Sequence, residues 1–249
     1  MPDSAPPSQD ALQARVRSLE TQLDALRRTQ SVLALGLSHD LRTPLRTVES
    51  FSWLLEQRGA SLDEQARDHL RRIRDASARM TRLHARLQSW LQVATAPLAC
   101  ADVDLSLLCD WCAAELRDAA PERDAIVEVA PDLRATGDER LLKTALQELL
   151  HNAFVFTVPG APVRIRVDGK RTPEGLLLRV HDAGTGFDAA HATKLGEPFQ
   201  RLHVDESAER CGFGLAIVRV VAERHGGRLH VESTPGQGTI AGMLLPDPP

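Results

Sequence analysis

Apolar residues near the start of the chain repeat with the spacing of a coiled-coil seam. They follow one another at intervals of four and three residues, at Leu12, Val16, Leu19, Leu23 and Leu26. Charged and polar side chains fill the positions between them, so the apolar stripe lies on one face of a helix. A lone helix would leave this stripe in water, which favours a coiled coil over residues 11–32; packing onto its own domain is the alternative. The Pro- and Ser-rich residues 1–10 are expected to be disordered.

The helical pattern continues beyond the seam until Gly59 interrupts it. After this glycine, Ser61 and Glu64 have the spacing of a capping box, which predicts a second helix that ends near Pro97. Two long helices joined by a short loop form an antiparallel hairpin. One hairpin leaves an apolar stripe exposed, whereas two copies bury it in a four-helix bundle. We therefore expect residues 33–97 to form a homodimer.

Beyond Pro97, short strands and helices follow one another irregularly, which predicts a second domain over residues 98–249. The expected helices span about 104–119, 139–154 and 214–225, and the expected strands span about 126–129, 163–167, 176–181, 228–232 and 240–245. Gly226 and Gly227 form a signal that ends the last helix. Because the order is not a regular βαβ repeat, the predicted fold class is α+β: a helical bundle followed by an α/β two-layer sandwich.

Composition excludes several classes of protein. The 249 residues include 43% hydrophobic and 26% charged side chains, which predicts one or two folded domains. A net charge of -4 and an aromatic content of 4% give no support for a nucleic-acid partner. No apolar run approaches the ~20 residues of a membrane span, and the first residues do not resemble a secretory signal. Cys109 and Cys112 lack companion zinc ligands, so we expect buried, reduced thiols in a cytoplasmic protein.

A first chemical site is predicted within the helical hairpin, where residues 38–46 read SHDLRTPLR. His39 and Thr43 are four residues apart, so they share a helix face, and their spacing from the leucines directs them toward solvent. A neutral imidazole is a nucleophile, and the neighbouring Asp40 can hold its tautomer and accept its proton. The hydroxyl of Thr43 can orient a water molecule. A surface histidine without a catalytic role is the alternative.

A second site is predicted from four short motifs in the sandwich. They are Glu148 with Asn152, Asp182-Ala-Gly184-Thr-Gly186, Gly212-Phe-Gly214-Leu215 and Gly236-Gln-Gly238-Thr239. The carboxylate and carboxamide of the first motif share a helix face and suit Mg²⁺. Asp182 is an acceptor suited to a purine amino group, and the glycines before the last helix offer backbone N–H groups to phosphates. Each motif alone is compatible with an ordinary turn, but their combination predicts a nucleotide site.

Together these motifs resemble the transmitter region of sensor histidine kinases of two-component signalling. The resemblance covers about residues 31–246 and follows the order of the family's motifs. His39 to Pro44 match the H-box, Glu148 to Thr157 the N-box, Asp182 to Gly186 the G1-box, Glu197 to Arg201 the F-box, Gly212 to Ala216 the G2-box, and Gly236 to Thr239 the last glycine motif. Within the family, the chain looks most like kinases coupled to bacterial phytochromes or PAS sensors.

The resemblance implies a dimerization and phosphotransfer hairpin followed by an ATP-binding domain of the gyrase, Hsp90, histidine kinase and MutL type. It implies that His39 accepts the γ-phosphoryl group of ATP, with Asp40 as its acid/base partner and Thr43 in dephosphorylation of a response regulator. The resemblance assigns Mg²⁺ to Asn152 and Glu148, and adenine to Phe156, Asp182 and Thr239. It places Gly184 and Gly186 in the turn after Asp182. It places Arg201 on the lid, and Gly212, Gly214 and Leu215 where the lid meets the last helix. A lid at about residues 189–211 is expected to close over nucleotide.

Three departures from the family's pattern leave alternatives open. Glu148 stands where the family usually has Asn, Val155 replaces a usual Lys, and Arg210-Cys211 replaces a usual Gly-Thr. Glu148 either alters Mg²⁺ coordination or acts as a general base for ATP hydrolysis. The alternatives to a kinase are therefore a nucleotide-sensing scaffold or phosphatase and an ATPase of the same fold. The expected partners are a second copy of the chain, a response regulator, and an upstream sensor domain or separate input protein, since 249 residues leave no room for a sensor.

Overall fold

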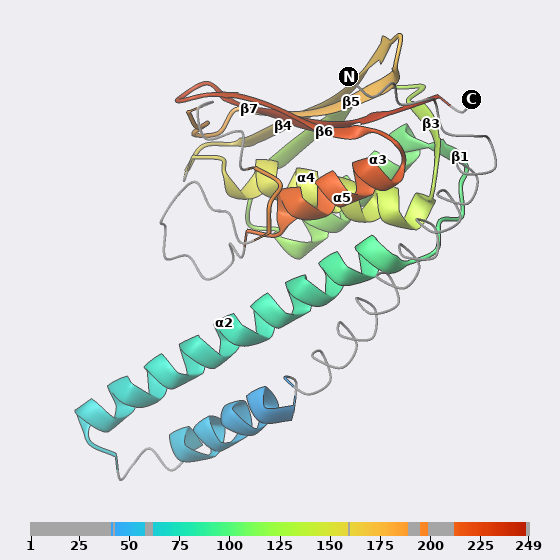
Figure 1. Cartoon of the computed structure of the whole chain (residues 1–249). Helices are drawn as coiled ribbons and strands as arrows, with labels where there is room; N and C mark the ends of the chain where they lie inside the picture. Colours follow the sequence, from blue (N-terminus) through green and yellow to red (C-terminus); the bar gives the residue numbers. More distant parts are fainter. Residues whose placement is uncertain are drawn as a thin grey trace, which may run out of the picture. The chain divides into compact units, whose positions relative to one another are not determined.

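The computed structural model describes residues 41, 43–57, 62–158, 160–188, 195–198 and 212–247, and Figure 1 colours them by position in the sequence. They fall into two compact units, and the boundary between the units lies between His84 and Ala85. The start of the chain and the predicted coiled coil over residues 11–32 lie outside the described residues. The predicted domain boundary at residue 97 stays a prediction.

The first unit contains the predicted helical hairpin. Residues 43–57 are helical, and α2 spans Glu64–Thr95 and so continues into the second unit. Two side-chain contacts join these helices: the Thr81 hydroxyl donates to Glu49 at 2.8 Å, and Arg74 forms an ion pair with Glu56. Residue numbers fall along α2 as they rise along the other helix. The two helices are therefore antiparallel, as predicted.

The start of α2 differs in detail from the prediction. The sequence pattern assigns the cap to Ser61, but the helix begins at Glu64 and its cap is Asp63. The Asp63 carboxylate accepts a hydrogen bond from the backbone N–H of Ala66 at 2.7 Å. Ser61 lies outside the described residues. A carboxylate accepts hydrogen bonds from the first N–H groups of a helix as a hydroxyl does. Its negative charge also interacts favourably with the positive end of the helix dipole.

Both helices of the hairpin expose large apolar side chains. They are Val48, Phe51, Trp53, Leu54 and Leu55 on residues 43–57, with Ile73 and Met80 on α2. Phe51 is 63% exposed and Trp53 is 52% exposed, which is unusual for aromatic side chains gathered on one element. Even so, none of the described helices is long and apolar enough to cross a membrane. The apolar stripe that a single hairpin is expected to leave uncovered is therefore present.

The second unit contains a five-stranded sheet in the order β2-β4-β5-β7-β6. Its strands are β2 (Ala125–Val129), β4 (Val163–Thr172), β5 (Gly175–Asp182), β6 (Arg228–Thr234) and β7 (Gly238–Leu245). β2 pairs in parallel with β4, and the other neighbours are antiparallel. Along β4, Val163, Ile165 and Val167 are buried while Arg164 and Arg166 are exposed, because successive side chains of a strand point to opposite faces.

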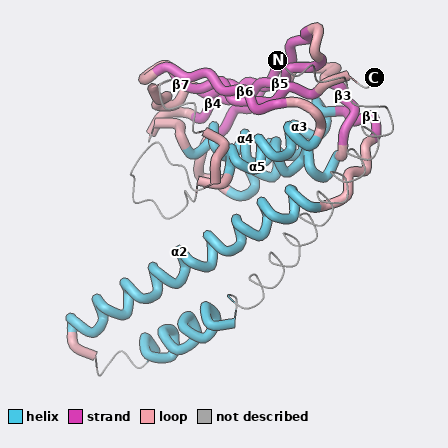
Figure 2. The backbone as a smooth tube through the Cα atoms, viewed as in Figure 1, coloured by secondary structure: helices cyan, strands magenta, loops and turns pink. Residues whose placement is uncertain are grey.

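Three helices cover one face of this sheet and complete a two-layer sandwich (Figures 1 and 2). They are α3 (Leu105–Ala119), α4 (Glu139–Val155) and α5 (Gly214–Arg224). Fully buried side chains fill the core, among them Leu142 and Leu146 on α4, Ile217 on α5, and Leu178 and Met243 on the sheet. The predicted α+β fold class is confirmed, and each predicted helix of this unit is present.

A pair of short strands is missing from the prediction. β1 (Ala101–Asp104) and β3 (Arg134–Gly137) form a separate antiparallel two-stranded sheet. The Arg134 guanidinium joins them by pairing with Asp102 at 2.6 Å and with Asp104 at 3.4 Å. Four residues are too few to show an alternating pattern, so contacts between segments far apart in the sequence form these strands.

Aspartates fix the start of two of the helices. Asp104 accepts from the backbone of Leu107 at 3.0 Å, and Asp138 accepts from the backbone of Arg140 at 3.1 Å. Asp138 also accepts from the backbone N–H of Ala99 at 2.8 Å. The Arg140 guanidinium is the main cause that lowers the pKa of Asp138 to about 2, and the backbone donors add to it. These caps satisfy N–H groups that each helix leaves unpaired, so they place the first turn of α4.

The end of α5 is tied to the start of α4. His225 Nε2 accepts from the backbone N–H of Asp138 at 2.9 Å, while its Nδ1 lies 2.7 Å from the Val221 carbonyl oxygen. The backbone N–H of Gly227 donates to the Ala222 carbonyl at 2.8 Å, which confirms that the paired glycines end this helix. Together these contacts hold the two helices in a fixed relation, and both of them line the pocket described below.

The two cysteines of the C-x-x-C pair are packing groups in α3. Cys109 is fully buried and Cys112 is nearly so. Burial raises the pKa of the Cys109 thiol well above its usual range and raises that of Cys112 to about 11. Thiols that stay protonated at neutral pH are unreactive. The interpretation of this pair as buried thiols is therefore confirmed.

Candidate functional site

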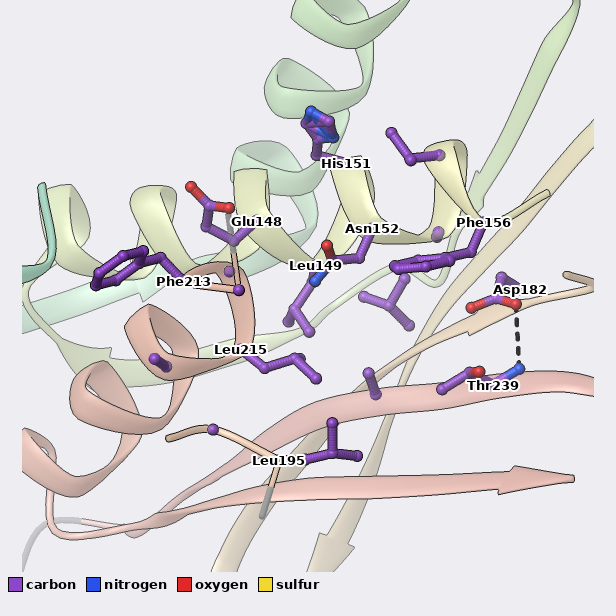
Figure 3. A pocket seen from close by; sticks show the side chains of 18 of the residues that line it. Glu148, Leu149, His151, Asn152, Phe156, Asp182, Leu195, Phe213, Leu215 and Thr239 are labelled. Atoms are coloured by element: carbon purple, nitrogen blue, oxygen red, sulfur yellow. Dashed lines mark hydrogen bonds between the residues drawn. The ribbon is translucent and has the colours of Figure 1, made fainter. Parts of the chain in front are cut away.

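A pocket opens in the second unit beside the C-terminal half of α4 (Figure 3). Its walls come from α4, from the end of β5, from the start of β7, from the start of α5, and from one residue of α2; residues 185–187, 195–197 and 212–213 complete them. In Figure 3, Glu148 and Phe213 lie at one end and Asp182 and Thr239 at the other, with Asn152 between them. The lining includes these predicted nucleotide residues: Glu148, Asn152, Phe156, Asp182, Gly186, Gly212, Gly214, Leu215 and Thr239. Motifs that are up to about 90 residues apart therefore meet at one place.

Backbone hydrogen bonds fix Asp182 at its end of the pocket. Its Oδ1 accepts from the backbone N–H of Gly184 at 2.8 Å and from that of Thr239 at 3.1 Å, and Figure 3 draws the second bond. Burial raises the pKa of this carboxyl, and the two backbone donors lower it. Because both bonds fall on Oδ1, Oδ2 keeps its capacity to accept from a ligand. A carboxylate held in this way suits the amino group of a purine.

The turn after Asp182 needs glycine because it lies against other backbone segments. A Cβ at Gly184 would lie 2.5 Å from the carbonyl oxygen of Phe156, which ends α4. A Cβ at Gly186 would lie 2.1 Å from the carbonyl oxygen of Thr234, and Gly186 has a φ of 59°. Any larger residue at either position would push the turn away from its neighbours. The predicted role of these glycines in close backbone approach agrees with this geometry.

The hydroxyl of Thr239 belongs to a small network that the sequence does not reveal. It lies 3.0 Å from the Ser233 hydroxyl, which also donates to the Gly238 carbonyl oxygen at 2.9 Å. The Ser233 oxygen accepts from the backbone N–H of Phe187 at 2.9 Å. Ser233 therefore connects β6, β7 and the turn after β5. Serine on a strand gives no signal of such a role, because its three partners are set by the register of the sheet.

At the opposite end, α4 presents two polar side chains to the start of α5. Glu148 and Asn152 are one helical turn apart, as predicted. A Cβ at Gly214 would lie 3.1 Å from Asn152 Nδ2 and 3.2 Å from Glu148 Oε2. The first residue of α5 is therefore in close contact with both side chains. Unpaired N–H groups and the helix dipole make the start of a helix favourable for anions.

The Glu148 carboxylate is paired with an arginine that the sequence analysis does not assign to the site. Arg86, on α2, forms an ion pair with Glu148 through Nη1 and Oε1. Glu148 is only 8% exposed, and this burial is the main cause that raises its pKa. Arg86 acts against that rise, because a cation favours the charged carboxylate. Arg86 was missed because it is 62 residues away and stands in a helix rich in arginine.

Further contacts hold the end of α2 against α5. The rings of Trp90 and Phe213 lie 6.5 Å apart in a tilted arrangement, and Phe213 is fully buried. The Arg224 guanidinium donates to the carbonyl oxygen of Val93 at 2.5 Å and to that of Ala96. A cation at the last carbonyls of a helix is favourable, because those oxygens lack partners within the helix. Arg86 therefore extends from a part of α2 that contacts α5 and its cap at Trp90 and at Val93.

The polar residues of the pocket fit a metal ion that arrives with a phosphate ligand. Across the described residues, no group of three or more His, Cys, Asp or Glu side chains is placed to hold a metal. Asn152 and Glu148 offer one amide oxygen and one carboxylate, and Mg²⁺ keeps several waters and takes the rest of its ligands from phosphates. This donor set therefore fits a nucleotide-borne Mg²⁺ and does not fit a resident ion held by protein alone.

The predicted hairpin site is described only in part. Thr43 is exposed, in agreement with its predicted position on a solvent-facing surface, and its carbonyl oxygen accepts from the Thr47 hydroxyl at 3.0 Å. His39, Asp40 and Arg201 lie outside the described residues, and their roles stay predictions. Of the predicted lid, residues 195–198 are described, and three of them line the pocket.

Two family models match the chain. A phospho-acceptor domain described as "His Kinase A" matches residues 29–91, which include the SHDLRTPLR motif. A domain described as "Histidine kinase-, DNA gyrase B-, and HSP90-like ATPase" matches residues 137–249, which include all four motifs of the pocket. ATP binding by the second region is therefore supported by the family model as well as by the geometry.

Curated relatives are similar over most of this chain. The phytochrome-like protein Cph1 of Synechocystis is 30% identical over 84% of the chain, and the probable sensor histidine kinase TcrY of Mycobacterium tuberculosis is 32% identical over 83%. The chain spans only 28% and 44% of the lengths of these two proteins. Among solved structures, full-length ShkA in complex with AMPPNP matches 86% of the chain and 45% of its own length, with 26% identity and a TM-score of 0.63.

Proposed function

Since this chain belongs to the sensor histidine kinase family, we propose that it is an ATP-dependent protein-histidine kinase. It phosphorylates itself on His39 and passes the phosphoryl group to an aspartate of a response regulator. The observation that carries this proposal is the meeting of four separate motifs in one pocket, in a chain that also contains the phospho-acceptor domain.

The pocket has two ends with different tasks. The adenine end consists of Asp182, Gly186 and Thr239, and Gly184 lies in the turn after Asp182 without lining the pocket. Asp182 accepts from the adenine amino group, and Phe156 packs on the ring. The phosphate end consists of Glu148, Asn152 and Gly214, where backbone N–H groups at the start of α5 donate to phosphate oxygens. Gly212 and Leu215 shape the approach to that helix, and Arg201 reaches the phosphates from the lid.

Asn152, with Glu148 beside it, would hold Mg²⁺ at the phosphate end. When bound, the ion neutralises charge on the phosphate oxygens and orients them for in-line attack. The residues of the chain contribute position more than chemistry, because transfer of a phosphoryl group depends mainly on alignment and charge neutralisation.

The chemical step takes place between His39 and the terminal phosphate. A neutral ring nitrogen of His39 attacks the γ-phosphorus, the bond from that phosphorus to the bridging oxygen breaks, and ADP leaves with the electron pair. Asp40 accepts the proton that the imidazole ring loses as the new N–P bond forms. The phosphoryl group then moves from His39 to an aspartate of the response regulator. Thr43 orients a water molecule that hydrolyses the aspartyl phosphate of that partner.

The expected oligomer is a homodimer built by the hairpin. Exposed Phe51, Trp53 and Leu54 on one helix and Ile73 and Met80 on the other provide an apolar surface that a second hairpin would cover. Burial of such side chains contributes roughly 25 cal/mol per Å² of apolar surface, from which the entropic cost of association is subtracted. An upstream sensor or separate input protein would act on this dimer, and the Arg-rich face of α2 offers a surface for the response regulator.

A labelling experiment tests the proposal. Incubation with γ-labelled ATP should transfer label to the chain in a form that acid removes and alkali preserves. His39→Gln should abolish the label, because glutamine has no nucleophilic ring nitrogen. His69→Gln is the matched control, since His69 is an exposed histidine on α2 and its loss should leave labelling unchanged. Equal labelling of His39→Gln and the unchanged chain would overturn the proposal.

An ATPase of the same fold is the second candidate, and the presence of the Glu148 carboxylate within the pocket favours it. Steady release of phosphate that survives His39→Ala but not Glu148→Gln would establish that activity. Release that stops with His39→Ala would exclude it, because all phosphate would then come from turnover of the phosphorylated histidine.

A further inference from the structure

The phosphate end of the pocket draws its positive charge from outside the sandwich. Among the described residues that line the pocket, Arg86 is the only lysine or arginine. It belongs to α2, whereas the rest of the described lining comes from α4 and the residues that follow it. Position 155, where the resemblance leads one to expect a lysine, is a valine. Among the residues that the structure describes, this lysine or arginine charge of the pocket therefore comes from α2 and not from the sandwich.

Acidic groups make this cation necessary. Glu148, Asp182 and Glu197 all line the pocket, and Glu148 touches the first residue of the helix that would receive phosphates. A triphosphate adds several further negative charges at the same place. Like charges at close range in a partly buried site repel strongly, because solvent screening is weak there. An unpaired Glu148 carboxylate would therefore oppose binding of a polyphosphate.

The geometry allows Arg86 to pair with the Glu148 carboxylate and with a bound phosphate at the same time. Only Nη1 of Arg86 is engaged with Glu148 Oε1, and a guanidinium has five N–H donors in a planar fork. About one third of the Arg86 side chain is exposed, so donors remain accessible to a ligand in the pocket. The contact between Trp90 and Phe213, one turn further along α2, limits how far Arg86 can move away.

We propose that Arg86 is a phosphate-binding residue of this pocket, which neutralises Glu148 and supplies the cation that Val155 does not. The proposal rests on the function proposed above, because it presumes that the pocket binds Mg·ATP. It extends that function by making nucleotide affinity depend on the end of α2. Since α2 also belongs to the phosphoacceptor hairpin, a change that moves the end of α2 would change the affinity for ATP.

A set of variants tests this inference in the full chain. Arg86→Gln removes the charge and keeps a polar side chain, Arg86→Lys keeps the charge, and Glu148→Gln removes the anion. The double variant Arg86→Gln/Glu148→Gln removes both. Arg72→Gln is the matched control, because Arg72 is a largely exposed arginine on the same helix and pairs only with Asp68 among the contacts found for it. Calorimetry measures affinity for Mg·ATP, ligand-observed NMR measures affinity for adenosine, and thermal unfolding checks that each variant folds.

The expected pattern has three parts. Arg86→Gln weakens Mg·ATP binding by about tenfold or more, as loss of a charged hydrogen bond does, and leaves adenosine binding within about twofold. Arg86→Lys loses less affinity than Arg86→Gln, while Arg72→Gln changes neither ligand. Measured without Mg²⁺, the double variant binds ATP more tightly than Arg86→Gln alone, because the unpaired carboxylate is gone and no metal ligand is lost with it.

Other outcomes would overturn the inference. If Arg86→Gln binds Mg·ATP as tightly as the unchanged chain, or more tightly, Arg86 is not a phosphate ligand and its ion pair competes with nucleotide. If Arg86→Gln loses ATP and adenosine equally, its role is only to support the fold of the pocket. An unchanged chain that binds no ATP would instead refute the proposed function, and this result is distinct from any change between variants.

Discussion

The two ends of the pocket are built in different ways. The adenine end is fixed by backbone atoms: the N–H groups of Gly184 and Thr239 hold Asp182, and the glycine turn lies against carbonyl oxygens. The phosphate end is fixed by side chains: Arg86 pairs with Glu148, and Gly214 touches the ends of Glu148 and Asn152. Backbone positions are set by the sheet and helices, whereas side chains can change rotamer. We therefore expect the adenine end to be the more rigid of the two, and the phosphate end to respond to the position of α2.

Asp182→Asn should have the largest effect on this comparison. The amide keeps an oxygen for the backbone donors but turns its NH₂ group toward the adenine amino group, which is also a donor. We expect ATP affinity to fall by roughly 100-fold, as in sites that leave a buried polar group unpaired. Calorimetry checks this value, and ADP should lose affinity equally because both share the base. Retention of affinity within a few-fold would show that Asp182 does not contact the base.

Gly184→Ala should follow. Its Cβ would lie 2.5 Å from the backbone oxygen of Phe156, which cannot move without shifting the end of α4. We expect a loss of about 1–3 kcal/mol in the free energy of unfolding, as for overpacking elsewhere, together with at least ~10-fold weaker ATP binding. Denaturant unfolding and calorimetry measure the two quantities. A variant that is as stable as the unchanged chain would contradict the close approach of these two segments.

Gly214→Ala tests the phosphate end in the same way and should be milder. Its Cβ would lie 3.1–3.3 Å from side-chain atoms of Asn152 and Glu148, which can give by a few tenths of an ångström. Alanine also favours a helix by up to ~1 kcal/mol over glycine, so stability should be unchanged or higher. We expect ATP binding to weaken only about threefold through displacement of the Asn152 amide. A loss as large as that of Gly184→Ala would remove the distinction between the two ends.

Thr239→Val should have the smallest effect. It removes the hydroxyl that lies 3.0 Å from Ser233 but retains the backbone N–H that donates to Asp182. A single exchangeable hydrogen bond contributes ~1 kcal/mol, so ATP affinity should change no more than about fivefold. A competition assay that ranks this variant with Asp182→Asn would show that the threonine hydroxyl, and not its backbone, recognises the base.

The sequence predicts the elements of the sandwich well and its side-chain contacts poorly. The apolar periodicity and the glycines at helix ends locate α4 and α5. The motif that begins at Asp182 lies at the end of β5, where the strand pattern stops. The pair formed by Arg86 and Glu148 escapes prediction because α2 carries many arginines. Contacts in the folded chain, among them the packing of Trp90 on Phe213, bring one of these arginines to the pocket. The strands β1 and β3 escape because their pairing depends on residues about 30 positions apart. Contacts between distant segments are what the fold adds to the pattern.

Resemblance to a known family predicts which residues bind nucleotide, but it says least about what is particular to this chain. Glu148 stands out in the sequence as a departure from the family's pattern, yet its partner is visible only in the folded chain. Glu148, which departs from the family's pattern, and Arg86, which pairs with it, therefore form one unit of the site. A carboxylate at this position is tolerable in a phosphate site because a cation from α2 accompanies it.

The proposed function depends on transfer of the terminal phosphate of ATP to His39. Mass spectrometry of the full chain after incubation with Mg·ATP, with digestion kept at neutral or alkaline pH, locates the phosphoryl group directly. We expect one phosphorylated peptide that contains His39 and loses its phosphate on brief exposure to acid. A phosphate on another residue, or a chain that consumes ATP while His39 stays unmodified, would contradict it.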